Sequence, residues 1–281
     1  MPTLNKLLSY FKSMRKFLKD GGHTTVNIAQ ISNGEILNGK RVLITGASSG
    51  IGLCIAKKCI SEGANVLITG RNEEKLEKAV SEINSDNLSY LKWDISDINI
   101  INSKIEIATQ LLGGNIDILV NNAGVLSPII FPNVTEEIWD QTYSTNSKGL
   151  YFLTQHICKL WLLQEDRNKK VINISSSGGF VGATYPYRMT KWDINGLTLG
   201  LGRKLASKGI IVNGIAPGRI ATKMQRCKNP KENIYDSTSF MQRYGLPEEI
   251  AELALFLISD SSNFITGQTI QCDGGGYKNN S

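Results

Sequence analysis

Tyr187 and Lys191 are the two residues of this 281-residue chain whose types and spacing most directly allow acid–base chemistry. Residues four apart on a helix lie on the same face, about 6 Å apart along its axis. A free phenol has a pKa of about 10, too high for easy proton transfer at neutral pH, but a nearby ammonium group stabilises the phenolate and lowers that pKa. Tyr187 is therefore a candidate general acid towards a carbonyl oxygen, or general base towards an alcohol, an effect worth roughly 10²–10⁴-fold. A Tyr and a Lys on a helix surface are commonplace by themselves, so this interpretation depends on other motifs.

A glycine-rich segment, TGASSGIG at 45–52, is the second chemical signal. It follows an apolar run at 41–44 and precedes a helical pattern. Glycines let the backbone turn sharply and approach a pyrophosphate, and a helix N-terminus supplies free N–H groups. Glycines after a strand are weak evidence alone, and the spacing G-x-x-x-G-x-G differs from the usual dinucleotide fingerprint. The strand before and the helix after nevertheless favour a phosphate-binding turn.

The elements that must position these residues follow from Lys40 onward, where short β-branched runs alternate with helical patterns. We expect strands at 41–46, 64–70, 88–94, 116–122, 169–175, 210–216 and 268–273. We expect helices at 50–62, 73–84, 97–112, 135–164, 186–208 and 247–259. Continuous apolar strands between helices indicate a parallel sheet covered on both faces. The sequence thus predicts an α/β, doubly wound, Rossmann-type fold with a mainly parallel seven-stranded sheet and helices on both faces.

Composition excludes several classes of protein. The chain is 41% hydrophobic and 20% charged, which is typical of a folded domain, and no apolar run reaches the length of a membrane span. Five cysteines without a C-x-x-C fit reduced thiols, so we expect a cytoplasmic location. Only His23 and His156 are histidines, and no metal site is expected. The net charge of +6 comes without a basic stripe and interleaved aromatics, so nucleic acid is not an expected partner.

Residues 1–36 differ in composition from the single domain expected at 37–281. Apolar residues recur there at helical spacing, with Lys and Arg between them: Leu4, Leu7, Leu8, Phe11, Met14 and Leu18. Asp20-Gly21-Gly22 ends this pattern, and 23–36 reads as a connecting arm. An apolar stripe in water should be covered. We favour packing on the chain's own core or a neighbouring subunit over contact with an anionic membrane surface.

Further motifs follow the glycine-rich turn in order: Asn121-Asn122-Ala123-Gly124, Asn146, Ser175-Ser176, Tyr187-x-x-x-Lys191, Asn213 with Pro217-Gly218 and Thr222, and Thr266-Gly267-Gln268 with Asp273-Gly274-Gly275. Together they resemble the short-chain dehydrogenase/reductase family, in its compact single-domain branch, over about 37–277. The resemblance implies an NAD(P)(H)-dependent oxidoreductase, with NADPH-dependent, reversible reduction of a ketone or aldehyde as the expected reaction. It also implies a homodimer or homotetramer, with the helix at 186–208 as a contact.

The resemblance also implies catalytic roles. Tyr187 would be the proton donor and Lys191 its partner, while Ser176 would hydrogen-bond the substrate oxygen. Asn146 would hold a helix kink and a water that links Lys191 to solvent. Alignment through the glycines that follow selects Ser176, but the loop before the tyrosine is shorter than usual, so Ser175 and Ser177 stay open.

The residues that the resemblance assigns to the cofactor come from the loops after successive strands. They are Gly46, Ser48, Ser49, Gly50, Ile51, Gly52, Arg71, Asp94, Asn122, Ala123, Gly124, Tyr187, Lys191, Pro217, Gly218, Ile220 and Thr222. Within this set, the Pro217–Thr222 segment would hold the carboxamide end. Asp94 would accept from the adenine amino group, with a strand-end cap as its alternative role, and Asn122 would lie along the adenosine.

The end of the second expected strand decides between the two nicotinamide cofactors. An acid there selects NAD, whereas an arginine accommodates a 2′-phosphate. Gly70 occupies the place of the acid and Arg71 follows, which suits NADP(H) because a guanidinium can meet a phosphate bidentately. A basic residue before Gly50 would be a second cue for NADP(H), and Ser49 stands there instead. We expect NADP(H) rather than NAD(H), with a solvated loop cation as the alternative reading of Arg71.

Residues 219–245 are the expected substrate lid, and their mixed character names no substrate. A 3-oxoacyl-thioester reductase is a specific alternative. A sugar epimerase or dehydratase of the family's longer branch is disfavoured, because that branch has another glycine spacing and a larger C-terminal domain. A non-catalytic cofactor-binding sensor or scaffold would be expected to lack Tyr187 or Lys191, and both are present.

Overall fold

The computed structural model describes residues 34–127, 129–165, 167–222 and 233–276, together with Phe11, Lys12, Met14, Arg15, Leu18 and Met224. Leu4, Leu7 and Leu8 of the expected amphipathic stripe and residues 23–33 of the expected connecting arm therefore lie outside the described residues. The stripe residues that are described are exposed: Phe11, Met14 and Leu18.

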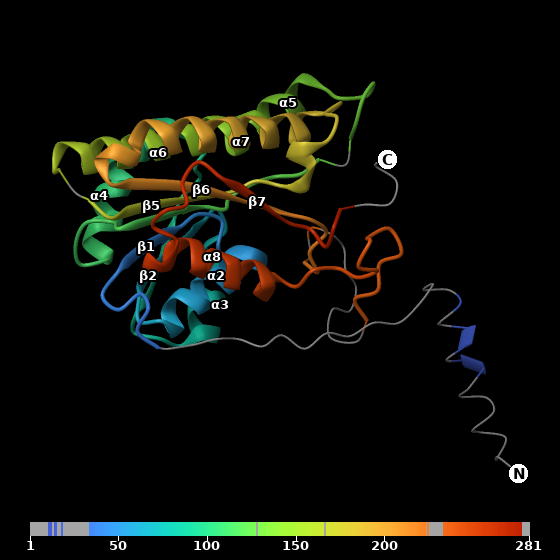
Figure 1. The fold of residues 1–281 in the computed structure, drawn as a ribbon, viewed down its shortest axis with the longest axis horizontal. Coiled ribbons are helices and arrows are strands. Elements are labelled where there is room, and N and C mark those ends of the chain that lie inside the picture. Colours follow the sequence, from blue (N-terminus) through green and yellow to red (C-terminus); the bar gives the residue numbers. More distant parts are fainter. Residues whose placement is uncertain are drawn as a thin grey trace, which may run out of the picture.

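Seven strands form one sheet in the order β3-β2-β1-β4-β5-β6-β7 (Figure 1). They are β1 (Arg41–Ile44), β2 (Asn65–Gly70), β3 (Leu88–Lys92), β4 (Ile118–Asn121), β5 (Lys169–Ile174), β6 (Ile210–Pro217) and β7 (Thr269–Cys272). Every neighbouring pair is parallel, which confirms the predicted doubly wound sheet. The strand order reverses between β1 and β4, and open α/β sheets bind their ligands beyond the carboxyl ends of the strands at such a point.

Helices cover both faces of the sheet (Figure 1). On one face lie α2 (Gly50–Ser61), α3 (Glu73–Ile83) and α8 (Pro247–Ile258); on the other lie α4 (Ile101–Leu111), α5 (Glu136–Tyr143), α6 (Leu150–Leu163) and α7 (Pro186–Leu205). Each face has its own apolar cluster. Val42 and Ile44 of β1 belong to the cluster under α2, and Leu43 belongs to the cluster under α6, as the two-residue period of a strand requires.

Local signals set where several helices begin. The side chain of Asn72 accepts from the N–H of Lys75 at 2.8 Å and caps α3. At α8, Pro247 occupies the first turn, and Glu249 Oε2 accepts from the N–H of Leu246 at 2.8 Å. Such side chains satisfy N–H groups that the helix itself leaves unpaired.

One expected helix differs from the structure. The segment predicted as a single helix at 135–164 is interrupted by a π-helix, Ser144–Gly149, between α5 and α6. The interruption fits tightly against the loop after β3, because a Cβ on Gly149 would lie 2.3 Å from the carbonyl oxygen of Ile95. Helical periodicity does not reveal such an insertion, since the apolar pattern continues on both sides. Short 3₁₀ turns are also present within the described ranges, at Ile98–Ile100, Ser177–Phe180, Ala206–Lys208 and Asp260–Ser262.

Candidate active site

The turn between β1 and α2 needs glycine at two points. Gly46 has φ 64°, and a Cβ there would lie 2.6 Å from the Cα of Ala123. Gly50 has φ 61° and is the first residue of α2. Ser49 before it is extended and makes no side-chain capping bond within the described structure, so the first N–H groups of the helix face outwards uncapped. This arrangement fits the phosphates of a dinucleotide.

Asn122 joins this turn to the loop after β4. Its Nδ2 donates to the carbonyl oxygens of Thr45 at 3.0 Å and Gly46 at 2.9 Å. The Thr45 hydroxyl accepts from the N–H groups of Asn122 and Ala123, both at 3.1 Å. A Cβ on Gly52 would lie 2.4 Å from Asn122 Nδ2, so the glycine admits this amide. The side chain of Asn122 thus positions the two loops of the proposed cofactor site.

Tyr187 and Lys191 lie one turn apart at the start of α7. The Nζ of Lys191 is 5.5 Å from the centre of the Tyr187 ring, and it donates to the carbonyl oxygen of Ile174, the last residue of β5, at 3.0 Å. Lys191 is buried, and this burial lowers its pKa to about 8. The amine therefore keeps its proton in most molecules at neutral pH, as stabilisation of a neighbouring phenolate requires.

Asn146 lies in the π-helix and faces the same space. It is fully buried; its Oδ1 accepts from the N–H of Val125 at 2.8 Å, and its Nδ2 donates to the carbonyl oxygen of Val125 at 3.0 Å. A Cβ on Gly124 would lie 3.4 Å from Asn146 Oδ1 and 3.8 Å from Lys191 Nζ. The side chains of Asn146 and Lys191 therefore meet beside Gly124, which has no side chain to separate them.

Thr190 is a residue of this site that the sequence analysis missed. Its hydroxyl donates to the carbonyl oxygen of Tyr187 at 2.8 Å and accepts from Asn146 Nδ2 at 3.2 Å. The available signal was its position three residues after Tyr187, because a helical threonine can bond to the carbonyl of the preceding turn. Thr190 ties the turn that carries the tyrosine to the π-helix.

The three serines after β5 have different surroundings. Ser175 is buried, and its hydroxyl donates to the carbonyl oxygen of Lys191 at 3.1 Å. Ser177 is also buried. Ser176 is half-buried, and its Oγ accepts from the N–H of Gly178 at 3.1 Å, which uses a lone pair and not the hydroxyl proton. Accessibility therefore favours Ser176 as the hydroxyl that meets a substrate.

Arg71 and Asp94 lie beyond the ends of β2 and β3. Arg71 is exposed directly after Gly70, and a Cβ on Gly70 would lie 3.7 Å from Ser48 Oγ. Asp94 Oδ1 accepts from the N–H of Ser96 at 3.0 Å and from its hydroxyl at 2.7 Å. One oxygen of Asp94 therefore has the capping role given above as the alternative, and the second oxygen takes no part in these bonds.

The segment after β6 returns over the glycine-rich turn. The methyl carbon of Thr222 would lie 3.5 Å from a Cβ on Gly50. Ile220 is buried and pairs with Gly245 in a parallel bridge, which brings the two ends of the expected lid together. The candidate cofactor residues on this segment are Pro217, Gly218, Ile220 and Thr222.

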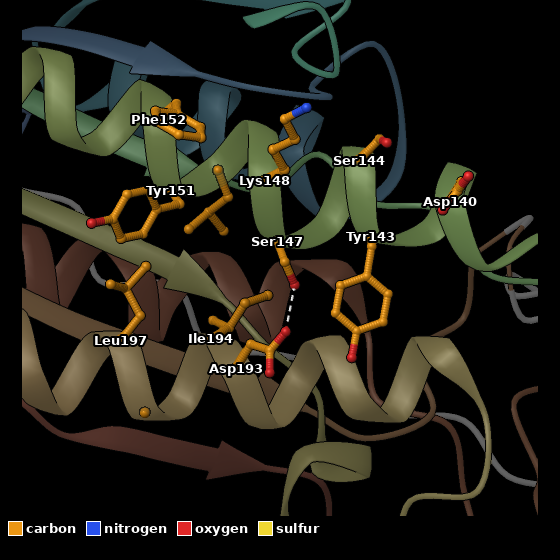
Figure 2. A pocket seen from close by; sticks show the side chains of 12 residues that line it. Asp140, Tyr143, Ser144, Ser147, Lys148, Tyr151, Phe152, Asp193, Ile194 and Leu197 are labelled. Carbon is orange, nitrogen blue, oxygen red and sulfur yellow. Dashed lines mark hydrogen bonds between the residues drawn. The ribbon is translucent and has the colours of Figure 1, made fainter.

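A separate groove of about 850 Å³ lies away from these residues, between the α5–α6 layer and α7 (Figure 2). Tyr143, Tyr151 and Leu197 line it, and Ser147 Oγ donates to Asp193 Oδ2 at 2.8 Å across it. The residues that line the groove include neither Tyr187 nor Lys191.

Within the described ranges, no group of three or more His, Cys, Asp or Glu side chains is placed to hold a metal ion. No helix in these ranges is long and apolar enough to cross a membrane.

Comparisons with known proteins place this geometry in a family. The family described as enoyl-(acyl carrier protein) reductase matches residues 46–277. The 3-oxoacyl-(acyl-carrier-protein) reductase FabG of Thermotoga maritima is 36% identical over 245 residues, which covers 85% of this chain and 98% of the relative. FabG of Staphylococcus aureus is 36% identical over 246 residues, with the same coverage.

Among solved structures, a short-chain dehydrogenase/reductase family protein has a TM-score of 0.76 and 30% identity over 85% of this chain and 97% of its own. The chain belongs to the short-chain dehydrogenase/reductase family. This family member is an oxidoreductase that uses NAD(P)(H) to interconvert a carbonyl group and an alcohol. An actinorhodin polyketide ketoreductase solved with NADPH has a TM-score of 0.76 and 29% identity over 84% of this chain and 96% of its own.

Proposed function

We propose that this dehydrogenase/reductase works as an NADPH-dependent reductase of a 3-oxoacyl thioester. The observation that carries the proposal is the pair of buried side chains of Lys191 and Asn146 that approach Gly124 beside Tyr187, on a chain that matches 3-oxoacyl reductases over nearly their whole length. Simple ketones and aldehydes are the broader substrate class. Reduction of an enoyl thioester is the second candidate, because the description of the matching family names that reaction.

The proton would come from Tyr187. Its phenol donates to the carbonyl oxygen as charge develops there, and the Ser176 hydroxyl donates to the same oxygen and orients it. Lys191, protonated at neutral pH and held by Ile174, stabilises the phenolate that remains. Asn146 Oδ1 and Lys191 Nζ both lie beside Gly124, so we propose that Asn146 holds the water through which the proton returns to Lys191. A bound nicotinamide cofactor supplies the hydride.

The cofactor would be held by groups that this chain provides without a metal. The N-terminus of α2 and the glycine backbone at 46–52 receive the pyrophosphate. Arg71 is exposed and, among the described residues, no ion pair or hydrogen bond engages its guanidinium, so it can meet a 2′-phosphate. Pro217–Thr222 would close over the carboxamide end. These features support NADP(H) over NAD(H).

We also propose that the chain functions as a homodimer or homotetramer through the face formed by α6 and α7. The groove of Figure 2 opens on this face, and large apolar side chains beside it are exposed: Tyr151, Leu163, Trp192 and Leu199. Nothing lies within 4 Å of a Cβ built on Gly196 or Gly200, so α7 presents a smooth surface for close helix packing. Gly202 differs, because a Cβ there would lie 2.3 Å from the N of Gly267 in the same chain.

The decisive experiment follows the loss of NADPH absorbance with a panel of matched substrates. Acetoacetyl-coenzyme A represents the 3-oxoacyl thioester, crotonyl-coenzyme A the enoyl thioester, and a simple ketone and aldehyde the remaining class. We expect the highest kcat/KM with the 3-oxoacyl thioester and a loss of this activity by roughly 10²–10⁴-fold in Tyr187→Phe. A higher kcat/KM with crotonyl-coenzyme A would assign the enoyl reaction instead. NADPH binding without turnover of any panel member would overturn the assignment of a 3-oxoacyl thioester as the substrate.

A further inference from the structure

We propose that Arg219 is a positioning residue that locks the substrate lid onto the segment that ends the cofactor site, and thereby sets the affinity for the carbonyl substrate. This inference rests on the proposed role of 219–245 as a lid. The contacts of the described lid residues, 219–222, 224 and 233–245, carry the argument.

The described part of the lid contains a short hairpin. Tyr235 and Arg243 form an antiparallel bridge. The N–H of Tyr244 donates to the carbonyl oxygen of Ile234 at 2.7 Å, and the N–H of Asp236 donates to the carbonyl oxygen of Gln242 at 3.1 Å. We call residues 234–244 the lid hairpin. Its main-chain bonds are few, and isolated two-stranded hairpins are marginal in water. The lid hairpin therefore needs side-chain contacts to keep a fixed position over the strand ends.

Arg219 supplies such contacts from outside the hairpin. Its Nη1 donates to Asp236 Oδ1 at 3.1 Å and to Thr238 Oγ1 at 2.8 Å, and its Nη2 donates to the hydroxyl of Tyr244 at 2.5 Å. The guanidinium carbon also lies 4.8 Å from the centre of the Tyr244 ring. One planar cation thus binds both strands and the turn of the hairpin, which a lysine could not do because it lacks the forked donors.

The positive charge of Arg219 stabilises the buried carboxylate of Asp236. Asp236 is buried, and the same Oδ1 that binds Arg219 accepts from the N–H of Thr238 at 3.1 Å and from its hydroxyl at 2.7 Å. Its Oδ2 is buried too, with no hydrogen-bond partner among the described residues. A buried carboxylate that loses its cation is strongly destabilised. Removing Arg219 should therefore displace this turn of the hairpin instead of leaving it in place.

The main chain of Arg219 connects the hairpin to the proposed cofactor site. Its carbonyl oxygen accepts from the N–H of Gly245 at 2.9 Å, and the carbonyl oxygen of Gly245 accepts from the N–H of Ala221 at 2.8 Å. Arg219 directly follows Gly218 and lies three residues before Thr222, which approaches Gly50. The same residue thus holds the hairpin by its side chain and belongs by its backbone to the segment over the glycine-rich turn.

The acid–base groups are carried by other elements. Tyr187 and Lys191 are on α7, and none of the contacts given for Arg219 involves either residue. Loss of Arg219 should therefore weaken substrate binding more than the chemical step. We expect Arg219→Ala to raise KM for the carbonyl substrate at least tenfold while kcat changes less than threefold. A tenfold rise in KM corresponds to about 1.4 kcal/mol of lost binding free energy.

The test compares four variants of the full chain with the wild type. Arg219→Lys keeps a positive charge near Asp236, so its KM should lie between the KM of the wild type and that of Arg219→Ala. Tyr244→Phe loses only one hydroxyl contact and should raise KM about two- to tenfold. Arg41→Ala is the matched control, because Arg41 is also a partly exposed arginine paired with an aspartate, Asp117 at 3.8 Å, but at the opposite end of the sheet. It should leave KM unchanged.

Hydrogen exchange of the lid hairpin, measured by mass spectrometry with and without NADPH, gives a readout that needs no turnover. Arg219→Ala should speed exchange in 234–244, and Arg41→Ala should not. An unchanged exchange rate in Arg219→Ala would overturn the proposal, even if the wild type reduced no member of the substrate panel. A lower thermal stability with an unchanged KM would overturn it as well, because it would make Arg219 merely structural.

Discussion

The hydroxyl of Ser175 donates a hydrogen bond to the main-chain carbonyl of Lys191 at 3.1 Å. This bond attaches the end of β5 to the catalytic turn of α7, and it uses the proton of Ser175. Ser176, the next residue, is half-buried and accepts from Gly178 instead. Two adjacent serines in the same short run therefore make different bonds: Ser175 holds α7, while the hydroxyl proton of Ser176 is not used in its bond to Gly178, which agrees with the role proposed for it towards a substrate.

Ser176→Ala should lower kcat with little loss of stability, whereas Ser175→Ala should do the reverse. Loss of the buried hydrogen bond of Ser175 should reduce the free energy of unfolding by about 1 kcal/mol. Steady-state kinetics and urea unfolding of both variants measure the two effects. A larger fall in kcat for Ser175→Ala than for Ser176→Ala would move the substrate contact to Ser175.

Tyr187→Phe should bind NADPH as the wild type does but lose turnover by roughly 10²–10⁴-fold, because only the ionisable oxygen is removed. Fluorescence titration with NADPH tests whether binding is unchanged, and the rate of NADPH oxidation tests whether kcat falls. Tyr185→Phe is the control: the Tyr185 ring stacks on that of Tyr187 with centroids 6.5 Å apart, but Tyr185 precedes the first residue of α7 and has no proposed role in proton transfer. Near-normal kcat in Tyr187→Phe with a true substrate would remove it as the proton donor.

Arg71→Ala should weaken NADPH binding far more than NADH binding. A charge-assisted hydrogen bond is worth roughly 1.5–3 kcal/mol, so the preference for NADPH should fall about ten- to a hundredfold. Lys78→Ala serves as the control, because Lys78 is an exposed cation on α3 that pairs with Glu82 at 3.7 Å. Equal losses for both cofactors would show that Arg71 does not read the 2′-phosphate, and a wild-type preference for NADH would overturn the cofactor assignment itself.

Burial of Lys191 predicts a pH dependence of stability. Its pKa is about 8 in the folded protein and about 10.4 in an unfolded chain. Between these values the unfolded chain binds more protons, so raising the pH stabilises the folded state. The free energy of unfolding of the wild type should therefore rise, relative to Lys191→Met, by about 3 kcal/mol from near pH 7 to above pH 10.

The comparison with Lys191→Met isolates this group, because Lys170, whose pKa burial also lowers to about 8, is present in both proteins. Urea unfolding of the two cofactor-free proteins at several pH values in this range measures the difference between their free energies of unfolding. A parallel pH dependence of the two proteins would mean that the Lys191 amine titrates normally.

Deletion of residues 1–36 should lower the melting temperature or change the oligomer size, as measured by calorimetry and light scattering. The described stripe residues Phe11, Met14 and Leu18 are exposed in a single chain, and cover by a neighbouring subunit would remove them from water. The intact protein should not float with vesicles that contain anionic lipids. Flotation that the deletion abolishes, with stability and oligomer size unchanged, would instead assign the arm to a membrane surface.

The sequence alone predicted the parallel sheet and most of its helices, which the structure confirms, and it named Tyr187 and Lys191 as the proton-relay residues, a role that stays a prediction. These predictions rest on local patterns: continuous apolar strands, the four-residue spacing of Tyr187 and Lys191, and glycines where a turn meets a helix. The physics behind them is local as well, because backbone geometry decides which neighbouring residues share a face or permit a positive φ. For that reason the expected sheet needed only small adjustments at the strand ends.

Only the tertiary structure decided how the polar groups are paired. Asn146 in the π-helix bonds Thr190, 44 residues away in sequence, and the buried amine of Lys191, whose pKa burial lowers, bonds Ile174 of β5 and lies close to Gly124 after β4. In the sequence, nothing distinguishes Arg219 from the other cations of the expected lid. In the structure, it binds Tyr244, 25 residues further on. Such contacts join segments that carry no common periodicity, so no pattern of neighbours predicts them, and they exist only once the sheet has brought those segments together.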